Sequence, residues 1–592
     1  MLFRSDLSGG IDFVIDLGRV EPIDKAVIRI NCGEKVNHYQ RSPKSLAAWV
    51  SKDGELFYPA APPMLKLEPG EKDQSDFRTQ YYLEENDRDI FCYPFELAIH
   101  ANARYVMLRI VPDGGNLYCD ELAILKAADA ATVSDAPYSG PGEKRLTDGI
   151  VSAPAENGKF YIADNIAAPN YFRLRDLRPA PGRSELLQVV ELPAGIEVKG
   201  DGVRAEAIER HGTRYTRFTR AIPAAAGQQS AFFEHQPLFF QAGPEAPRNG
   251  ARAYFYLTID GQPSHESERE LAVITLPECT QPFRGLTAIS RMGIGDQVWP
   301  GYFDNLRKLG FSGIQIYPYM YMRRGVDAFP ADYRAMAATA RECGFKIVLG
   351  FNGLAEMYRR DNLPQDEIWC QYPTDIPDRN PCPSYRGKSY QAELDKITRA
   401  VIEFKPDYIQ WDVEQWGGSM PRVRQCSRCA EGQKRSGKSW EDYLDDLSVE
   451  LNRDLTVAVD RGAQTAGIPR PEIYNYNRQA LTESYHGFEK WALNRQFVAG
   501  PMPSLYVAGS ELRVHDSIRG NFERQEDKTR RTIIPVLTPG TYGAYEPWHL
   551  EAMIYETMLN GGAGFCYYPW RGFVSPVYFY YHARAMNQII RY

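Results

Sequence analysis

The 592-residue sequence predicts a multidomain protein in which two N-terminal β-sandwich domains precede a C-terminal (β/α)8 barrel. The chain is too long for a single domain. Its first half contains short segments that alternate apolar and polar residues between Gly, Pro and Asp, which is typical of antiparallel sheets. From residue 286 onward, strand-like and helix-like segments alternate, which is typical of a parallel barrel.

Residues 1–127 are expected to form the first sandwich, because segments such as "KAVIRINCG" and "ARYVMLRIV" are rich in β-branched residues. Asp-Leu-Gly at 16–18, Ser-Lys-Asp-Gly at 51–54 and Arg-Tyr-Val at 104–106 follow one another in an order that resembles the discoidin (factor V/VIII type C) jelly roll. The resemblance implies a module that binds carbohydrate or is purely structural. Few residues precede the first motif, where that family usually has another strand and a ligand-binding loop. The module is therefore abbreviated, or an upstream segment is missing.

Residues 128–150 are small, polar and rich in turn formers, so we expect a linker. Residues 151–283 return to short strands such as "TRYTRFTRAI" and are expected to form the second sandwich. No pattern in this domain indicates chemistry. We therefore expect it to support the first module against the barrel, which spans 284–592.

Eight strands and eight helical links fit into the last part of the chain, as a TIM barrel requires. An open doubly wound sheet is the alternative, but the sequence has no dinucleotide-binding fingerprint. The expected strands are 286–294, 312–321, 345–353, 407–415, 472–477, 504–509, 532–539 and 562–570. The expected helices are 302–310, 332–344, 390–405, 440–467, 488–496, 522–531, 548–562 and 578–590.

Two carboxylates end the fourth expected strand, in the sequence "PDYIQWDVEQW". Asp412 and Glu414 are two residues apart, so they point to the same side of the strand, as does Gln410. Neighbouring carboxylates repel, which raises the pKa of one of them and suits it to donate a proton. The alternative is an exposed strand end that caps the next helix. In a barrel, these C-terminal strand ends carry the active site.

The other strand ends supply amides, phenols, an arginine and an indole, and neither a metal triad nor a lysine placed for a Schiff base is apparent. Such groups suit a neutral polyhydroxylated ligand, although packing alone would also explain the aromatic residues. Aromatic residues make up 12% of the chain, which also favours a carbohydrate partner. The candidate substrate-binding residues are Arg291, Tyr317, Tyr319, Asn352, Asn475, Asn477, Glu511, Tyr568 and Trp570, with Tyr506 at a further strand end.

With "WDVE" ending strand four, an aromatic residue ending strand eight and sandwiches upstream, residues 286–592 resemble the glycoside hydrolases. Similarity to the chitinase-like enzymes implies that Glu414 donates the proton and that Asp412 is its electrostatic partner. However, the longer acidic run of those enzymes is missing. Similarity to the α-galactosidase-like clan implies instead that Asp412 is the nucleophile.

A third clan of glycoside hydrolases has an Asn-Glu acid at strand four and a nucleophilic Glu after strand seven. Val413 occupies the Asn position here, while Glu546 in "TYGAYEPW" is the candidate second carboxylate and Glu511 is the reserve. The resemblance implies cleavage of a glycosidic bond between two carboxyl groups. The alternatives are a carbohydrate-binding protein with a degenerate barrel, and a sugar lyase or isomerase, which would normally need a metal or a basic residue at the strand ends.

Four cysteines lie in two loops that are neighbours in a barrel. Cys426 and Cys429 form a Cys-x-x-Cys motif after strand four, and Cys370 and Cys382 follow strand three. Four thiols from neighbouring loops could hold a tetrahedral structural zinc ion, and the motif resembles a cysteine-bearing loop of some β-galactosidase-like barrels. Free thiols or disulfides are the alternatives. No cofactor is expected for catalysis, and the remaining cysteines are expected to be buried apolar residues.

A net charge of −7 argues against a nucleic-acid partner, and no apolar segment is long enough to span a membrane. The sequence leaves the oligomeric state open. It also leaves the compartment open: export fits a polysaccharide enzyme whose leader lies upstream, and a cytoplasmic location is expected otherwise.

Overall fold

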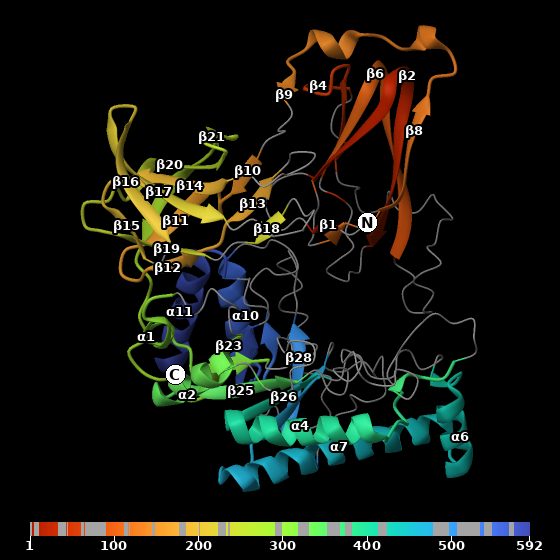
Figure 1. The fold of residues 1–592 in the computed structure, drawn as a ribbon, viewed down its shortest axis with the longest axis vertical. Coiled ribbons are helices and arrows are strands. Elements are labelled where there is room, and N and C mark those ends of the chain that lie inside the picture. The colour runs from red at the N-terminus through yellow and green to blue at the C-terminus, as the bar shows by residue number, and fades with distance from the viewer. Residues whose placement is uncertain are drawn as a thin grey trace.

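A computed structural model gives the fold of the chain (Figure 1). The residues that it describes are 3–4, 11–33, 43, 45–60, 64–65, 90–111, 116–117, 119–144, 149–154, 156–176, 185–199, 202–222, 232–234, 237–290, 299–317, 329, 331–351, 368–372, 382–412, 423–477, 496–505, 533–537, 547–567 and 573–591. Two β-rich regions precede a closed barrel. In Figure 1 the first sheet lies at one end of the molecule and the barrel helices α4 (Lys388–Phe404) and α7 (Trp440–Ala466) lie at the other.

The first region is an antiparallel sheet of seven strands in the order β8-β2-β6-β3-β4-β9, with β5 beside β3. The described residues form this sheet and a separate pair of short strands, and they do not show the discoidin jelly roll. Its strands are β2 (Ile11–Gly33), β3 (Ser45–Ser51), β4 (Leu56–Pro59), β5 (Met64–Leu65), β6 (Ile90–Val111), β8 (Cys119–Lys126) and β9 (Glu143–Lys144), and β1 (Phe3–Arg4) pairs with β7 (Asn116–Leu117).

The motifs that resemble discoidin have structural roles in this sheet. Arg104 donates two hydrogen bonds to the carboxylate of Asp16, at 2.9 and 3.0 Å, and thereby lowers the pKa of Asp16 to about 2. Asp53 accepts the backbone N–H of Glu55 and closes the turn after β3. Because β9 lies inside the expected linker and pairs with β4, the sheet extends to residue 144.

The second region contains two sheets that enclose one apolar core. A three-stranded sheet of β10 (Gly149–Ser152), β13 (Arg173–Asp176) and β18 (Phe232–Glu234) faces a ten-stranded sheet. Phenylalanine rings fill the space between them, with the centroids of Phe160 and Phe255 5.0 Å apart. The ten strands are β11 (Lys159–Ala163), β12 (Ala168–Asn170), β14 (Leu186–Pro193), β15 (Ile196–Lys199), β16 (Val203–Arg210), β17 (Thr213–Ile222), β19 (Leu238–Ala242), β20 (Asn249–Ile259), β21 (Gln262–Pro263) and β22 (Ser267–Ile274).

Eight parallel strands then close into a barrel in sequence order, which confirms the predicted barrel and excludes the open sheet. The strands are β23 (Leu286–Ser290), β24 (Gly313–Ile316), β25 (Lys346–Phe351), β26 (Tyr408–Asp412), β27 (Glu472–Asn477), β28 (Gly500–Leu505), β29 (Val536–Leu537) and β30 (Gly564–Tyr567). Strand six was predicted too late in the chain. It contains Pro501 and Pro503, which usually indicate that a segment is not a central strand.

Helices cover the outside of the barrel. Besides α4 and α7 they are α1 (Tyr302–Lys308), α2 (Ala331–Glu342), α6 (Ser427–Ser436), α10 (Trp548–Leu559) and α11 (Pro576–Arg591). The segment of α6 was expected to be a loop. Gly310 ends the first helical segment at φ +92°, and a Cβ there would lie 2.8 Å from Cys279 Sγ, so both the turn and the close packing require glycine. The expected helices at 488–496 and 522–531 lie outside the described residues, apart from residue 496.

The inside of the barrel changes from apolar to polar along its axis. Strands β23 and β25 to β30 together contribute an apolar cluster that includes Leu286, Val348, Tyr474 and Cys566. Because members of this cluster come from strands all around the barrel, they fill its interior rather than its helix-covered outside. Towards the C-terminal ends of β23, β24 and β26, the buried side chains are polar.

The second region and the barrel share one continuous core. The indole of Trp299, on the chain that leaves β23, donates to the carbonyl of Ala167 at 2.6 Å and stacks on Phe239. On the chain that leaves β30, Val574 accepts the backbone N–H of Tyr171 at 3.0 Å. The second region therefore holds the segments that follow two adjacent barrel strands. No helix in the described part of the chain is both long and apolar enough to cross a bilayer.

Candidate functional site

Asp412 is the last residue of β26, and its Cα pairs with Tyr476 of β27. It thus ends its strand on the C-terminal side of the barrel, although its side chain is not among those described. The other two catalytic candidates, Glu414 and Glu546, lie outside the described residues. The same is true of Arg291, Tyr319, Asn352, Tyr506, Glu511, Tyr568 and Trp570, which therefore stay predictions.

A buried polar layer surrounds Gln410, two residues before Asp412 on β26. Gln410 is 2% exposed, and its side-chain oxygen accepts hydrogen bonds from the amide of Gln315 and from the hydroxyl of Tyr317, the latter at 2.9 Å. Gln315 in turn accepts a bond from Ser290 at 2.7 Å. Since buried polar groups are costly unless paired, this connected layer fixes the orientation of each amide.

Tyr317, a predicted substrate residue, reaches across strand β25 to join this layer. A Cβ built on Gly350 would lie 2.3 Å from Cε1 of the Tyr317 ring, so only glycine leaves room for the ring at this position. Its hydroxyl donates a hydrogen bond to Gln410. The contact described for Tyr317 is to the polar layer, and its role in substrate binding stays a prediction.

The structure does not support the prediction that Asn475 contacts substrate. Its side-chain nitrogen donates to Asn452 Oδ1 of helix α7 at 3.3 Å, and the residue is 3% exposed. The alternation in β27 makes Tyr474 part of the interior cluster and turns Asn475 outward, towards the helix. Asn475 is thus not a substrate contact at the barrel opening. Asn477 ends the same strand, and its side chain is outside the described set.

Gln315 and Ser290 belong to the polar layer but were not among the predicted site residues. Gln315 is the single polar residue in "GIQI", a strand that is otherwise apolar and wholly buried. Ser290 ends β23 on the inward side, with its hydroxyl bonded to Gln315 and to the carbonyl of Tyr567. A polar residue inside a buried apolar strand is itself a signal, because its position requires a partner.

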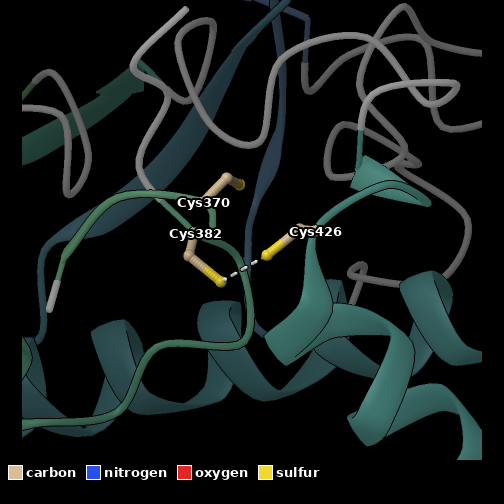
Figure 2. A group of neighbouring side chains, drawn as sticks. All are labelled: Cys370, Cys382 and Cys426. Carbon is tan, nitrogen blue, oxygen red and sulfur yellow. Dashed lines mark hydrogen bonds between the residues drawn. The ribbon is translucent and has the colours of Figure 1, made fainter. Parts of the chain in front are cut away.

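Four cysteines meet beside the barrel, between the segment that follows β25 and helix α6. The Sγ of Cys382 lies 3.8 Å from that of Cys426 and 3.5 Å from that of Cys429. The sulfurs of Cys370, Cys382 and Cys426 all lie within 4.8 Å of one another, and all four residues are buried. Figure 2 shows three of them, with Cys382 and Cys426 directed towards each other. The structure therefore brings the four cysteines of the two predicted loops together, as predicted.

Hydrogen-bond donors surround these sulfurs. The backbone N–H of Gln371 donates to Cys426 Sγ at 3.2 Å, and the hydroxyl of Ser384 lies 3.2 Å from Cys429 Sγ. Hydrogen bonds from Cys370 and the other two thiols lower the pKa of Cys426. Hydrogen bonds among the thiols also lower the pKa of Cys382 but raise that of Cys370 and Cys429, so negative charge is favoured on Cys426 and Cys382.

No family model matches the chain, and no curated protein matches its sequence. Similar solved structures include the PgaB (BpsB) glycoside hydrolase domain from Bordetella bronchiseptica, with 9% identity and a TM-score of 0.38 over 52% of this chain and 99% of that one. A glycoside hydrolase family 18 chitinase from Cycas revoluta has 9% identity and a TM-score of 0.33 over 51% and 99%. A xyloglucanase from Bacteroides ovatus has 8% identity and a TM-score of 0.28 over 74% and 100%. At this level of similarity, none of them assigns the chain to a family.

Proposed function

We propose that this chain is a glycoside hydrolase that acts at the C-terminal end of its barrel, with Glu414 as the general acid. Asp412 is its electrostatic partner or the nucleophile, and Glu546 is the candidate second carboxylate. The observation that carries the proposal is the position of Asp412 at the end of β26, two residues after Gln410 and the buried amide layer formed around it.

Hydrolysis of a glycosidic bond needs one carboxyl group to protonate the leaving oxygen and another to attack the sugar or activate water. The proton donor needs a raised pKa, and a carboxylate two residues away on the same strand supplies the repulsion that raises it. The polar layer supports this assignment because it places fixed dipoles around Gln410, two residues before Asp412 on the same strand. In such a site, preorganised dipoles stabilise charge that develops in the transition state.

The ligand chemistry follows from the remaining side chains predicted at the strand ends. Amides and phenols suit hydroxyl groups, and aromatic rings suit the apolar faces of sugar rings. The proposal therefore names a neutral oligo- or polysaccharide as substrate. Arg291, Tyr319, Asn352 and Trp570 are the proposed contacts, together with Tyr568 and Glu511.

The test compares Glu414→Gln with Glu431→Gln, which changes an exposed residue on α6. The wild-type protein is first screened against chromogenic glycosides and plant, algal and host glycans. Loss of the general acid should lower the turnover number about 10²–10⁴-fold while carbohydrate affinity is kept. Glu431→Gln should match the wild type in both measurements.

Equal turnover of the two variants would overturn the role of Glu414. A wild-type protein that binds a glycan but turns over no member of the panel would instead indicate the degenerate, carbohydrate-binding barrel. In that case Glu414→Gln should leave affinity nearly unchanged, since uncharged amides keep most hydrogen bonds to hydroxyl groups.

A further inference from the structure

We infer that Cys370, Cys382, Cys426 and Cys429 bind a single Zn²⁺ ion as a tetrahedral tetrathiolate. The site joins the segment that follows β25 to the first turn of α6. It lies outside the proposed hydrolytic site and does not depend on it.

The distances fit a mononuclear site. A zinc–sulfur distance of about 2.3 Å places the ligands of a regular tetrahedron about 3.8 Å apart. The two sulfur pairs nearest each other are separated by 3.5 and 3.8 Å, and three of the four sulfurs lie within 4.8 Å of one another. Little movement is therefore needed to place Cys370, Cys382 and Cys426 on one ion, and Cys429, whose sulfur lies 3.5 Å from that of Cys382, is the fourth ligand. In a polynuclear iron–sulfur cluster the thiolates bind different iron atoms, which holds them farther apart.

Disulfides do not explain the arrangement. A disulfide requires about 2.05 Å between sulfurs, whereas the sulfur of Cys382 lies 3.8 Å from that of Cys426 and 3.5 Å from that of Cys429. Apolar burial alone does not explain it either, because four sulfhydryl groups from two separate segments converge on one point. By contrast, Cys566 lies singly in the barrel interior among apolar side chains, as a cysteine buried only for packing does.

The surroundings suit the charge of such a site. Four thiolates and Zn²⁺ carry a net charge of −2, which burial penalises unless donors face it. Gln371 and Ser384 supply a backbone N–H and a hydroxyl to the sulfurs. Arg428 lies between two of the ligands in sequence, and its guanidinium stacks on the Tyr385 ring at 5.3 Å. Its Nη1 atom is buried without a hydrogen-bond partner, and a nearby negative charge would stabilise it.

The site has a consequence for the segment that carries Glu414. That segment begins at the end of β26, and the chain next enters the described structure just before Cys426, the N-cap of α6. Zinc bound at Cys426 and Cys429 fixes this far end against Cys370 and Cys382. We therefore expect loss of the metal to destabilise this side of the barrel. This destabilisation can be measured without any activity, and it rests on the proposed function only if glycosidase activity is used to detect it.

The test measures metal directly on the full-length protein, purified with zinc in the buffer. Elemental analysis should give about one zinc per chain in the wild type. Cys566→Ala, which removes a buried cysteine elsewhere, should keep this ratio, whereas Cys370→Ser and Cys382→Ser should lose most of the metal. Replacement with Co²⁺ should give the ligand-field and thiolate charge-transfer bands of a tetrahedral site in the wild type and in Cys566→Ala.

A second measurement uses only the wild type, so it does not depend on whether a variant folds. A mercurial reagent that blocks the four thiols should release the bound zinc. Zinc-supplemented wild-type protein without bound metal would overturn the inference, as would disulfides between these cysteines in mass mapping. Retention of zinc in both serine variants would also overturn it. None of these readouts uses glycosidase activity, so failure of the proposed function leaves them interpretable.

Discussion

Gly350→Ala is the change by which the polar layer is best tested. Gly350 lies on β25, and a Cβ there would approach the Tyr317 ring to 2.3 Å at Cε1, 2.5 Å at Cδ1 and 2.8 Å at Cζ. These contacts are too short to be relieved by small shifts, so the ring must move. Movement of the ring breaks the 2.9 Å hydrogen bond from its hydroxyl to Gln410.

The expected cost has two parts. Forcing an extra carbon into a packed interior costs about 1–3 kcal/mol. Losing a hydrogen bond inside the barrel adds about 0.5–1.5 kcal/mol. The sum is about 1.5–4.5 kcal/mol. Each kcal/mol lowers the melting temperature of a large domain by roughly 2–4 °C. The proposed hydrolase activity should fall as well, because Gln410, two residues before Asp412, loses a partner.

The assay is thermal unfolding followed by circular dichroism, together with turnover on the best glycoside found in the panel. Tyr317→Phe removes only the hydroxyl and should cost about 0.5–1.5 kcal/mol. Gly140→Ala is the matched control, since the nearest atom to its added Cβ is a carbonyl oxygen at 3.6 Å. Its expected effect is within about 0.5 kcal/mol. If Gly350→Ala melts with the wild type, the ring does not lie across β25 and the reasoning is refuted.

Three further changes test the buried groups that support the site. Burial lowers the pKa of His582 to about 3, so only the unfolded chain takes up its proton as the pH falls below about 6.5. Stability should therefore be full above this pH and fall by about 1.4 kcal/mol for each pH unit below it. Denaturant titrations at several pH values should show this slope in exposed His211→Asn and lose it in His582→Phe. Glu191→Gln leaves Arg210 and Arg217 facing a neutral amide, which should cost about 2–3 kcal/mol in urea unfolding; a loss below about 0.5 kcal/mol would contradict this account. Trp299→Ala removes an indole that is 2% exposed and should cost about 3–5 kcal/mol, splitting the calorimetric transition into two, whereas a single unshifted transition would show that the shared core does not couple the domains.

The alternation of strands and helices predicted the barrel because it depends only on hydrophobic period and chain length, which the sequence contains. The position of strand six was predicted wrongly from this pattern. Pro501 and Pro503 lack the N–H that a strand usually donates, yet β28 pairs with β27 at both positions. Helix α6 was missed because it is short and strongly charged, and its only buried residue is Cys429. The helix meets the rest of the fold at the sulfurs and at Gly432, which packs against Tyr443 of α7.

Side-chain direction was harder to predict than strand position. In "EIYNYN", phenols and amides alternate, so polarity does not reveal which set faces the barrel interior. The structure turns Tyr474 inward and Asn475 outward, because helix α7 offers Asn452 as a partner for the buried amide. For β26 the pattern was clearer. Outward Ile409 and Trp411 are apolar, which left Gln410 on the inward side.

The segments that leave the barrel strands are held in place at two separate points, the contact with the second region and the proposed zinc site. These two points are called the two devices below. The second region holds the chain after β23 and β30 through Trp299 and Val574. The proposed zinc site holds the chain after β25 and β26, on the other side of β24. The two devices share no described hydrogen bond, so their effects should be additive within about 0.5 kcal/mol. Combining Trp299→Ala with Cys370→Ser should therefore give the sum of the two stability losses. A combined loss much smaller than that sum would mean that both devices act through one cooperative element around the whole C-terminal end, and that metal and domain contact stabilise the same rearrangement.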